Sequence, residues 1–235
     1  MYCSWQDRLP ETVEVRAYQA PGRASRIAEP PISRLGDLIA EVVSAIAPHS
    51  GQPYALFGHS FGALVCFEVA RQMSSVGAPP SHLFVSGASA PQIRRKHDSL
   101  HNLPDAEFID HIRRLNGTPP ELLALPEFLS LMVPPLRSDL AMAYSYEYIK
   151  KDRLECPITV FGGDRDPRAP VSELDAWSIE TRHSCAIEIF AGDHFFIHKH
   201  QQAIVEQVGV SSLCPLRTVD LAGQTRRTGR VNRDR

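Results

Sequence analysis

The sequence has little that would hold it to a membrane or to nucleic acid. No stretch of its 235 residues is long or apolar enough to span a bilayer. The opening residues, Met-Tyr-Cys-Ser-Trp-Gln-Asp-Arg, lack the apolar core of a signal peptide. The formal net charge is −2 at pH 7, so there is no overall attraction for nucleic acid. These absences predict a cytoplasmic protein that binds neither a membrane nor nucleic acid.

Cysteine is scarce and scattered, with five residues at positions 3, 66, 156, 185 and 214. An odd number of cysteines, mostly inside apolar runs, predicts buried free thiols in a reducing compartment. None of the ten histidines forms an i, i+4 pair with an intervening glutamate. We therefore expect no metal site of that kind and no cofactor.

The composition otherwise fits one globular domain followed by a tail. With 43% apolar residues, a chain of this length can bury one sizeable core, which we expect within residues 1–208. The remainder, residues 209–235, becomes basic. Residues 216–235 hold six arginines, two aspartates and no aromatic residue that would stack on bases. This composition predicts a solvated, disordered tail.

Strand and helix patterns alternate along the chain. Helical periodicity is found at residues 35–46 and 171–179. Apolar runs predict strands at residues 12–19, 54–57, 83–87, 158–161 and 186–190. Strands that alternate with helices predict an α/β fold with a mostly parallel sheet, whose carboxyl edge gathers the functional loops.

The most specific motif is Gly-His-Ser-Phe-Gly at residues 58–62, between an apolar run and an amphipathic segment. A Gly-x-Ser-x-Gly motif between a strand and a helix presents the serine at the apex of a sharp turn. We expect Gly58 and Gly62 to allow the close approach of strand and helix. The start of the helix then lies under Ser60, where it favours negative charge. Ser60 is thus the predicted nucleophile.

A serine nucleophile of this type needs an acid and then a histidine, each after a later strand. Asp164 and Asp166 follow the run at 156–163, and His194 follows the run at 185–190. His194 would accept the proton of Ser60, and a carboxylate would orient its imidazole. We prefer Asp166 to Asp164 as the acid because its place farther along the loop gives it the reach. Asp164 stays as the alternative.

Residues 98–151 interrupt the alternation, because they show helical patterns without a convincing strand. The helical pieces are at residues 105–115, 121–132 and 136–149. A helical insertion after the nucleophile is where a lid would cover the site. Its apolar side chains would either line a channel for an acyl chain or bury the insertion against the body; they include Leu122, Phe128, Leu131 and Met132.

Ordered motifs over residues 4–208 resemble the type II thioesterases of polyketide, nonribosomal peptide and fatty acid synthesis, within the α/β-hydrolase superfamily. The Gly-His-Ser-Phe-Gly motif resembles the Gly-His-Ser-Met-Gly of that family, and Gly-Asp-His-Phe-Phe at 192–196 resembles its Gly-Gly-His-Phe-Phe. Other similar segments are Gln-Ala-Pro-Gly-Arg at 19–23, Glu-Pro-Pro at 29–31, Leu-Asn-Gly-Thr-Pro at 115–119 and Leu-Arg-Ser-Asp at 136–139.

The resemblance implies an α/β-hydrolase fold with a helical lid and a triad of Ser60, Asp166 and His194. It also implies hydrolysis of acyl groups from the phosphopantetheine thiol of an acyl or peptidyl carrier protein, through a serine acyl-enzyme. A flexible pantetheine arm with a small acyl group would suit a shallow site under the lid, near which the carrier would dock.

The sequence departs from the family at its amino end. Family members begin with a strand and a Phe-Pro-x-Ala-Gly-Gly loop before the Ser-Trp that aligns with Ser4-Trp5, and this sequence has neither. In the family that loop supplies one oxyanion donor, and the backbone N–H of Phe61 would supply the other. Loss of one donor typically costs roughly 10²- to 10³-fold in turnover. A truncated gene or misassigned start, another donor and a decayed enzyme are the explanations, and we prefer the first.

Two other functions are kept beside the thioesterase. A catalytically silent carrier-binding homologue would keep the lid but lack a complete oxyanion hole. An esterase for small oxygen esters would use the same triad, and we rank it last because the similarity extends across the lid.

Overall fold

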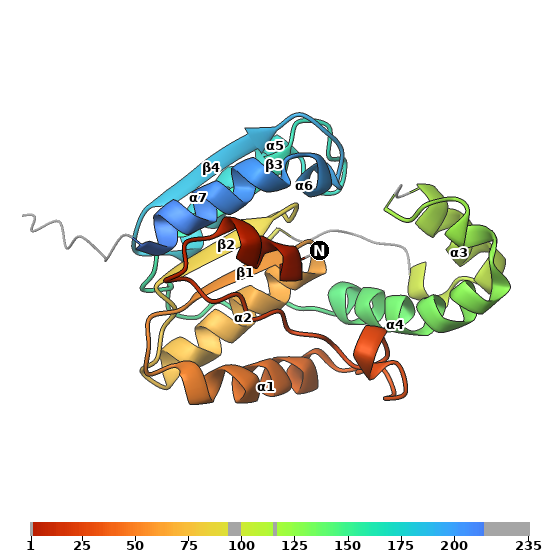
Figure 1. Ribbon diagram of the computed structural model, residues 1–235, viewed down its shortest axis with the longest axis horizontal. Coiled ribbons are helices and arrows are strands. Elements are labelled where there is room, and N and C mark those ends of the chain that lie inside the picture. Colours follow the sequence, from red (N-terminus) through yellow and green to blue (C-terminus); the bar gives the residue numbers. More distant parts are fainter. Residues whose placement is uncertain (1, 94–99, 115–116, 214–235) are drawn as a thin grey trace, which may run out of the picture.

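The computed structural model describes residues 2–93, 100–114 and 117–213. Four strands form one parallel sheet in the order β1-β2-β3-β4, so each pairs with the next along the chain (Figure 1). Because the strands are parallel, the loops that follow them meet at one edge of the sheet. The strands are β1 (Ala55–His59), β2 (His82–Ser86), β3 (Ile158–Gly163) and β4 (Cys185–Phe190).

Helices cover both faces of this sheet, as expected for an α/β-hydrolase fold. The α-helices are α1 (Leu35–Ile46), α2 (Phe61–Ser75), α3 (Asp105–Arg114), α4 (Pro126–Tyr144), α5 (Val171–Leu174), α6 (Phe196–Lys199) and α7 (Gln201–Leu213). Short 3-10 helices are η1 (Tyr2–Arg8), η2 (Ala24–Arg26), η3 (Ala47–His49), η4 (Leu100–Asn102), η5 (Leu122–Ala124) and η6 (Asp175–Glu180).

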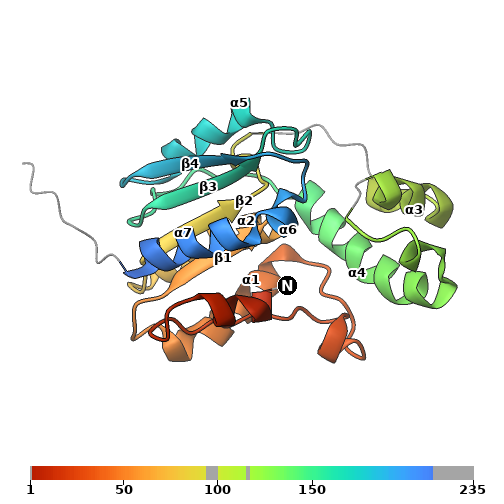
Figure 2. The same cartoon turned by 45° about the horizontal axis from the view of Figure 1, so that its top comes forward.

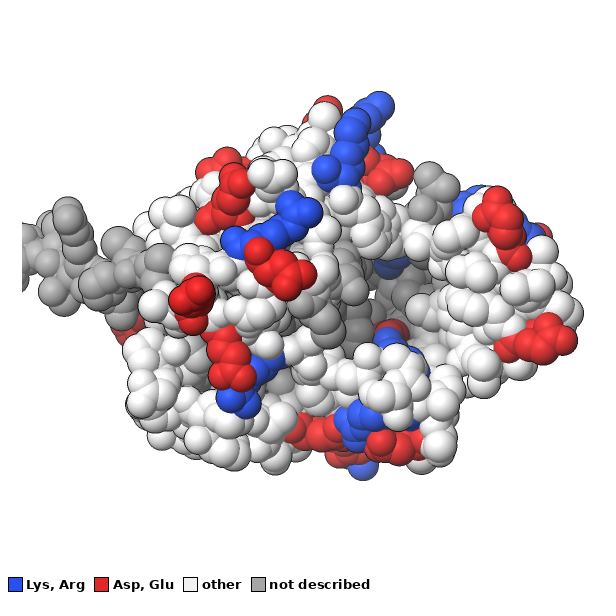
Figure 3. All heavy atoms as spheres, viewed as in Figure 1, with Lys and Arg blue, Asp and Glu red and all other residues white. Residues whose placement is uncertain are grey.

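The segment between β2 and β3 contains η4, α3, η5 and α4, and we refer to these four helices as the lid, after the role expected for them. The lid stands apart from the sheet, beyond the carboxyl ends of the strands (Figures 1 and 2). The lid has a small apolar core of its own, formed by Phe108, Ile112, Leu123, Val133 and Leu140. The surface is hollowed between the lid and the body of the molecule (Figure 3).

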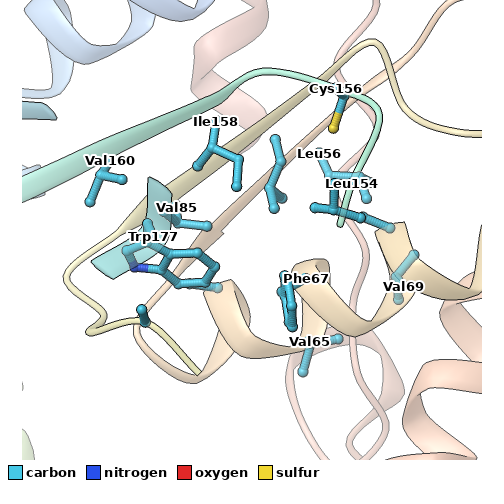
Figure 4. Close-up of a cluster of buried hydrophobic side chains, with 14 of the residues drawn as sticks. Leu56, Val65, Phe67, Val69, Val85, Leu154, Cys156, Ile158, Val160 and Trp177 are labelled. Atoms are coloured by element: carbon cyan, nitrogen blue, oxygen red, sulfur yellow. The ribbon is translucent and has the colours of Figure 1, made fainter. Parts of the chain in front are cut away.

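One face of the sheet packs on α1 and α2 to form the main core (Figure 4). Phe67 of α2 meets Trp177 of η6 edge to face, with ring centroids 5.6 Å apart. The indole N–H of Trp177 donates to the carbonyl of Ala88 at 2.9 Å, so the one polar atom of this buried ring has a partner. Trp177 therefore joins the chain after β3 to both α2 and the end of β2.

The opposite face is covered by α6, α7 and η1. Trp5 of η1 lies edge-on to Phe57 of β1, with ring centroids 4.6 Å apart. Ile204 and Val205 of α7 are fully buried in the same cluster as Phe161 of β3. The central strands β2 and β3 are buried along their whole length, as expected when both faces of a parallel sheet are covered.

The predicted strand at 12–19 is wrong, because the structure assigns no strand to those residues. The side chain of Gln6 bonds to this segment instead. Its amide donates to the carbonyl of Val13 at 2.9 Å, and its carbonyl accepts the N–H of Val15 at 2.8 Å. A side-chain amide thus satisfies backbone groups that a neighbouring strand would otherwise bond.

The two predicted lid helices at 121–132 and 136–149 are also wrong, because one helix, α4, continues through Pro134 and Pro135. Each proline removes one backbone donor, which normally interrupts a helix. Val133, Pro135 and Leu140 are nevertheless buried. Packing of this face of α4 therefore outweighs the two missing hydrogen bonds.

Two boundaries differ from expectation near the carboxyl half. The segment predicted as one helix at 171–179 is a short α5 followed by η6. The predicted domain end at 208 falls inside α7, which continues to Leu213. Residues 214–235 of the predicted tail lie outside the described residues.

The packing of Trp177 gives a stability prediction. Trp177→Ala should lower the free energy of unfolding by about 3–5 kcal/mol, because it leaves a cavity in the main core. The matched change Ile179→Ala, at a side chain that is 50% exposed in the same 3-10 helix, should change it by less than about 0.5 kcal/mol. Urea unfolding of the two variants measures the difference, and equal effects would contradict this account of the core.

Candidate active site

Ser60 lies in the sharp turn between β1 and α2. Its backbone has φ 55° and ψ −122°, a conformation that residues with a side chain seldom adopt. The N–H of Ser60 donates to the carbonyl of Ser86 at 2.7 Å, which holds the turn against the end of β2. Phe61 is the first residue of α2, so its N–H has no acceptor within the helix. This N–H and the helix dipole favour negative charge beside Ser60.

The turn depends on one of its two glycines. A Cβ atom at Gly58 would lie 2.1 Å from the carbonyl oxygen of Gly62, which is too close for any side chain. A Cβ atom at Gly62 would meet nothing within 4 Å. The expectation that both positions must lack a side chain is therefore wrong for Gly62. What Gly62 contributes to the close approach is its backbone.

The structure brings Ser60, His194 and Asp166 into one chain of hydrogen bonds. Nε2 of His194 lies 2.9 Å from Oγ of Ser60, and Nδ1 of His194 lies 2.8 Å from Oδ2 of Asp166. Asp166 follows β3 and His194 follows β4, and each is only 4% exposed. Three loops at the carboxyl edge of the sheet thus converge on one point.

The environment of Asp166 favours its ionised form. Burial would raise its pKa, but the hydrogen bond and charge of His194 act in the other direction, as do the N–H groups of Arg168 and Ala169. The Arg168 N–H donates to Oδ1 of Asp166 at 2.8 Å. The net effect lowers the pKa of Asp166 below its ordinary value. The carboxylate is therefore charged at neutral pH and holds the Nδ1 side of His194.

Asp164, the alternative acid, holds the backbone next to His194 instead of its ring. Its Oδ1 accepts the N–H of Gly192 at 2.7 Å. The N–H of Arg165 donates to the carbonyl of Gly192 at 3.0 Å, so two bonds join the loops after β3 and β4. Asp164 thereby fixes the turn from which His194 projects.

His59 is a second imidazole at the site, and it lies next to Ser60 in the chain. Its ring centroid is 5.0 Å from that of His194, and its Nδ1 lies 2.9 Å from Oγ of Ser86. Its Nε2 is buried without a hydrogen-bond partner among the described residues. Burial, with a smaller contribution from His194, lowers the pKa of His59 to about 3. A neutral His59 leaves no second positive charge beside His194.

Sequence reasoning missed a direct contact between the lid and the site. Gly117, on the lid loop before η5, lies against Phe195, since a Cβ atom at this glycine would be 2.1 Å from Cζ of Phe195. Phe195 in turn lies edge-on to His194, with ring centroids 5.2 Å apart. The glycine in Leu-Asn-Gly-Thr-Pro and the aromatic pair after His194 were the available signals.

The apolar lid residues singled out in the sequence have different positions. Leu122 and Leu131 are exposed at 37% and 55%, whereas Met132 packs against the core of the lid. Phe128 is half-buried. These positions do not test whether an acyl channel runs beneath the lid.

The residues that the structure describes, 2–93, 100–114 and 117–213, offer neither a metal cluster nor a membrane span, and they hold free thiols. In these ranges no group of His, Cys, Asp and Glu side chains could hold a metal ion, and no helix is long and apolar enough to cross a membrane. Cys66, Cys156 and Cys185 are free thiols. Burial raises the pKa of Cys66 and Cys156 to about 12 and that of Cys185 to about 11, so these thiols are protonated at neutral pH.

A family model and the solved structure of a similar protein both carry the name thioesterase. The family model described as "Thioesterase domain" matches residues 1–211. The solved structure of the type II thioesterase BorB from the borrelidin biosynthetic cluster is similar with TM-score 0.77 and 34% identity, over 83% of this chain and 79% of that one. ClbQ from the colibactin NRPS/PKS pathway is similar with TM-score 0.84 and 32% identity, over 89% and 90% of the two chains.

One relative that is named a dehydrogenase is similar over nearly the whole chain. It is linear gramicidin dehydrogenase LgrE of Brevibacillus parabrevis, which is 39% identical over 226 residues, or 93% of this chain and 86% of the relative.

The two glycines of the turn give a matched pair of substitutions. Gly58→Ala should lower the free energy of unfolding by about 1–3 kcal/mol or more, because the added methyl group would overlap the backbone of Gly62. Gly62→Ala should be neutral, or stabilising by up to about 1 kcal/mol, because the methyl enters open space on a helix. Thermal and urea unfolding test this, and a stable Gly58→Ala protein would refute the proposed packing of the turn.

His59 should make stability depend on pH. Its pKa is near 6.5 in the unfolded chain and about 3 when folded. Below about pH 6.5 only the unfolded chain takes up this proton, so the free energy of unfolding should fall with decreasing pH by up to about 1.4 kcal/mol per unit. In His59→Gln that contribution is lost, and the decline should be shallower.

Urea unfolding between about pH 7 and pH 5 measures this dependence. Ser86→Ala is the control, because it removes the hydrogen-bond partner but keeps the titrating ring, and it should retain the slope of the unmodified protein. An unchanged slope in His59→Gln would show that other groups account for the dependence.

Proposed function

Because this chain belongs to the thioesterase domain family, we propose that it hydrolyses acyl thioesters on the phosphopantetheine arm of carrier proteins. The observation that carries the proposal is the hydrogen-bonded chain of Ser60, His194 and Asp166 at the carboxyl edge of the sheet. The lid beside this edge supports the proposal, because a lid can enclose a flexible arm.

In the first half of the proposed reaction, Ser60 becomes acylated. Nε2 of His194 accepts the hydroxyl proton while Oγ of Ser60 attacks the thioester carbonyl carbon, and Asp166 stabilises the imidazolium. The carbonyl oxygen becomes negative, and the N–H of Phe61 is placed to donate to it. The C–S bond then breaks and the carrier thiol leaves with the proton from His194.

Water completes the reaction. His194, neutral again, accepts a proton from a water molecule as its oxygen attacks the acyl carbon on Ser60. The ester C–O bond breaks, Ser60 regains its proton from His194, and the free acid is released. Because a thiol leaves readily, the demand on the protein lies in activating Ser60 and stabilising the oxyanion.

The dehydrogenase name of one relative does not favour a redox reaction here. Binding of a dinucleotide at a strand–turn–helix typically uses Gly-x-Gly-x-x-G, whose glycines admit the pyrophosphate. This sequence contains no Gly-x-Gly at all. The turn at which such a loop would lie is occupied by Ser60 and its hydrogen-bonded partners. These features support hydrolysis.

An acyl or peptidyl carrier protein is the proposed partner, and the cytoplasm is the proposed location. The free thiols of Cys66, Cys156 and Cys185 are compatible with a reducing compartment. The relatives from peptide and polyketide pathways support a carrier of that kind.

Release of an acyl group from a carrier protein, followed by intact-protein mass, tests the proposal. Ser60→Ala should reduce release by on the order of 10⁴- to 10⁶-fold, and Asp166→Asn by about 10⁴-fold. Asp164→Asn is the matched control. Its side-chain oxygen can still accept the Gly192 N–H, so we expect less than about a tenfold loss.

The competing functions give different results in the same assay. Equal turnover of a simple oxygen ester and the carrier thioester would favour a general esterase. Carrier binding without any Ser60-dependent release would favour a silent binding protein and contradict the proposed hydrolysis. A larger loss in Asp164→Asn than in Asp166→Asn would reverse the assignment of the acid.

A further inference from the structure

An ion pair that includes none of Ser60, His194 and Asp166 joins the lid to the body. The guanidinium of Arg23 donates to both carboxylate oxygens of Asp139 in the lid helix α4, at 2.9 and 3.0 Å. It also donates to the carbonyl of Pro135 at 3.4 Å. The side chains are only 34% and 21% exposed, so the pair is largely shielded from water. A bidentate pair of this kind fixes both distance and orientation.

The segment that carries Arg23 is itself held firmly. Gly22 has φ 81°, and a Cβ atom there would lie 2.7 Å from Cγ of Pro31, so the chain folds tightly back on itself. The Gly22 N–H donates to the carbonyl of Arg26 at 3.0 Å. The Arg26 side chain then pairs with Glu29 and with Glu41 of α1. We call residues 19–31 the anchor loop.

Arg23 reaches α4 where that helix is weakest. Pro134 and Pro135 lack N–H groups, so the carbonyls one turn earlier have no helical donor at this point. A helix interrupted in this way bends more readily than a continuous one. The contacts of Arg23 to Pro135 and Asp139 therefore hold the turn at which α4 would bend.

Other bonds hold the chain that leaves the lid. Tyr146 donates to Glu68 of α2 at 2.7 Å, and Arg71 of α2 donates to the carbonyl of Ile149 at 2.6 Å. The return segment after α4 is thus fixed to the body. Arg23 adds a second fixed point within α4, and two fixed points define the direction of the helix.

We propose that the Arg23–Asp139 pair is a latch that sets the lid at one position and thereby limits the length of the acyl chain that the site accepts. This inference rests on the proposed thioesterase function. Arg23 and Asp139 are positioning residues, because they touch neither Ser60 nor His194 in the contacts described above. Release of the pair would let α4 swing and would admit longer chains beneath the lid.

The burial of Asp139 makes its carboxylate depend on Arg23. Burial raises the pKa of Asp139 even though Arg23 acts to lower it. A carboxylate in such a place is costly without its partner, so removal of one member should release the other toward water. The contact of Gly117 with Phe195 would move with the lid, which links its position to the neighbour of His194.

The test compares Arg23→Gln, Asp139→Asn and the exchanged pair, Arg23→Asp together with Asp139→Arg. Arg16→Gln is the control, because it removes an exposed ion pair with Glu14 outside the lid. Hydrogen exchange of α3 and α4 reports lid motion, and kcat/KM for acetyl and octanoyl carrier thioesters reports selectivity. Thermal unfolding verifies that every variant is folded.

Each single variant should exchange at least about tenfold faster in α4, since a lid helix freed of one anchor opens at lower free energy. The ratio of octanoyl to acetyl kcat/KM should rise by about tenfold. The exchanged pair should restore at least part of both values. Arg16→Gln should leave both within about twofold.

The outcomes separate the latch from the proposed function. Single variants that behave like Arg16→Gln would overturn the latch. Faster exchange that the exchanged pair does not reverse would assign the effect to lost packing and would also overturn it. If the unmodified protein releases neither acyl group, the proposed function fails, while hydrogen exchange alone still decides whether the pair holds the lid.

Discussion

The close approach of β1 and α2 is the constraint on which the rest of the site depends. Gly58 lies against the carbonyl of Gly62, at a distance that no side chain would permit. In the same turn Ser60 has a positive φ, and its side chain lies at the carboxyl edge of the sheet. The main core holds α2 in place beneath the strands. The packing of α2 against the strands thus fixes the position of the Ser60 hydroxyl group.

Around that hydroxyl, the structure distributes charge unevenly. Asp166 is kept ionised behind His194, whereas His59 on the other side is kept neutral by burial. The proton that His194 would accept from Ser60 therefore meets one negative neighbour and no positive imidazole. Asp164, though it has the same chemistry as Asp166, is used for backbone support. The two aspartates therefore differ in their partners because of their places in the loop after β3: Asp164 bonds to the backbone of Gly192, and Asp166 bonds to the His194 ring.

Much of the sheet and the site could be predicted, because each strand is an apolar run and each site residue follows one. The failures have local and distant causes. Residues 12–19 have the pattern of a strand but bond to the Gln6 side chain, and α4 tolerates two prolines because its apolar face is buried. Arg23 and Asp139 are 116 positions apart, so no periodicity relates them. The family resemblance includes the segments at 19–23 and 136–139 that carry these two residues. It does not indicate that Arg23 and Asp139 touch.

The order of the strands has a consequence for the growing chain. Each strand pairs with its successor, so the sheet can extend one strand at a time as synthesis proceeds. The site cannot form in this way, because Ser60 and His194 are separated by 134 positions. A nascent chain that ends before β4 would already contain the serine turn and the lid, yet would lack His194. The proposed hydrolase would therefore be inert on the ribosome until nearly all of its domain had emerged.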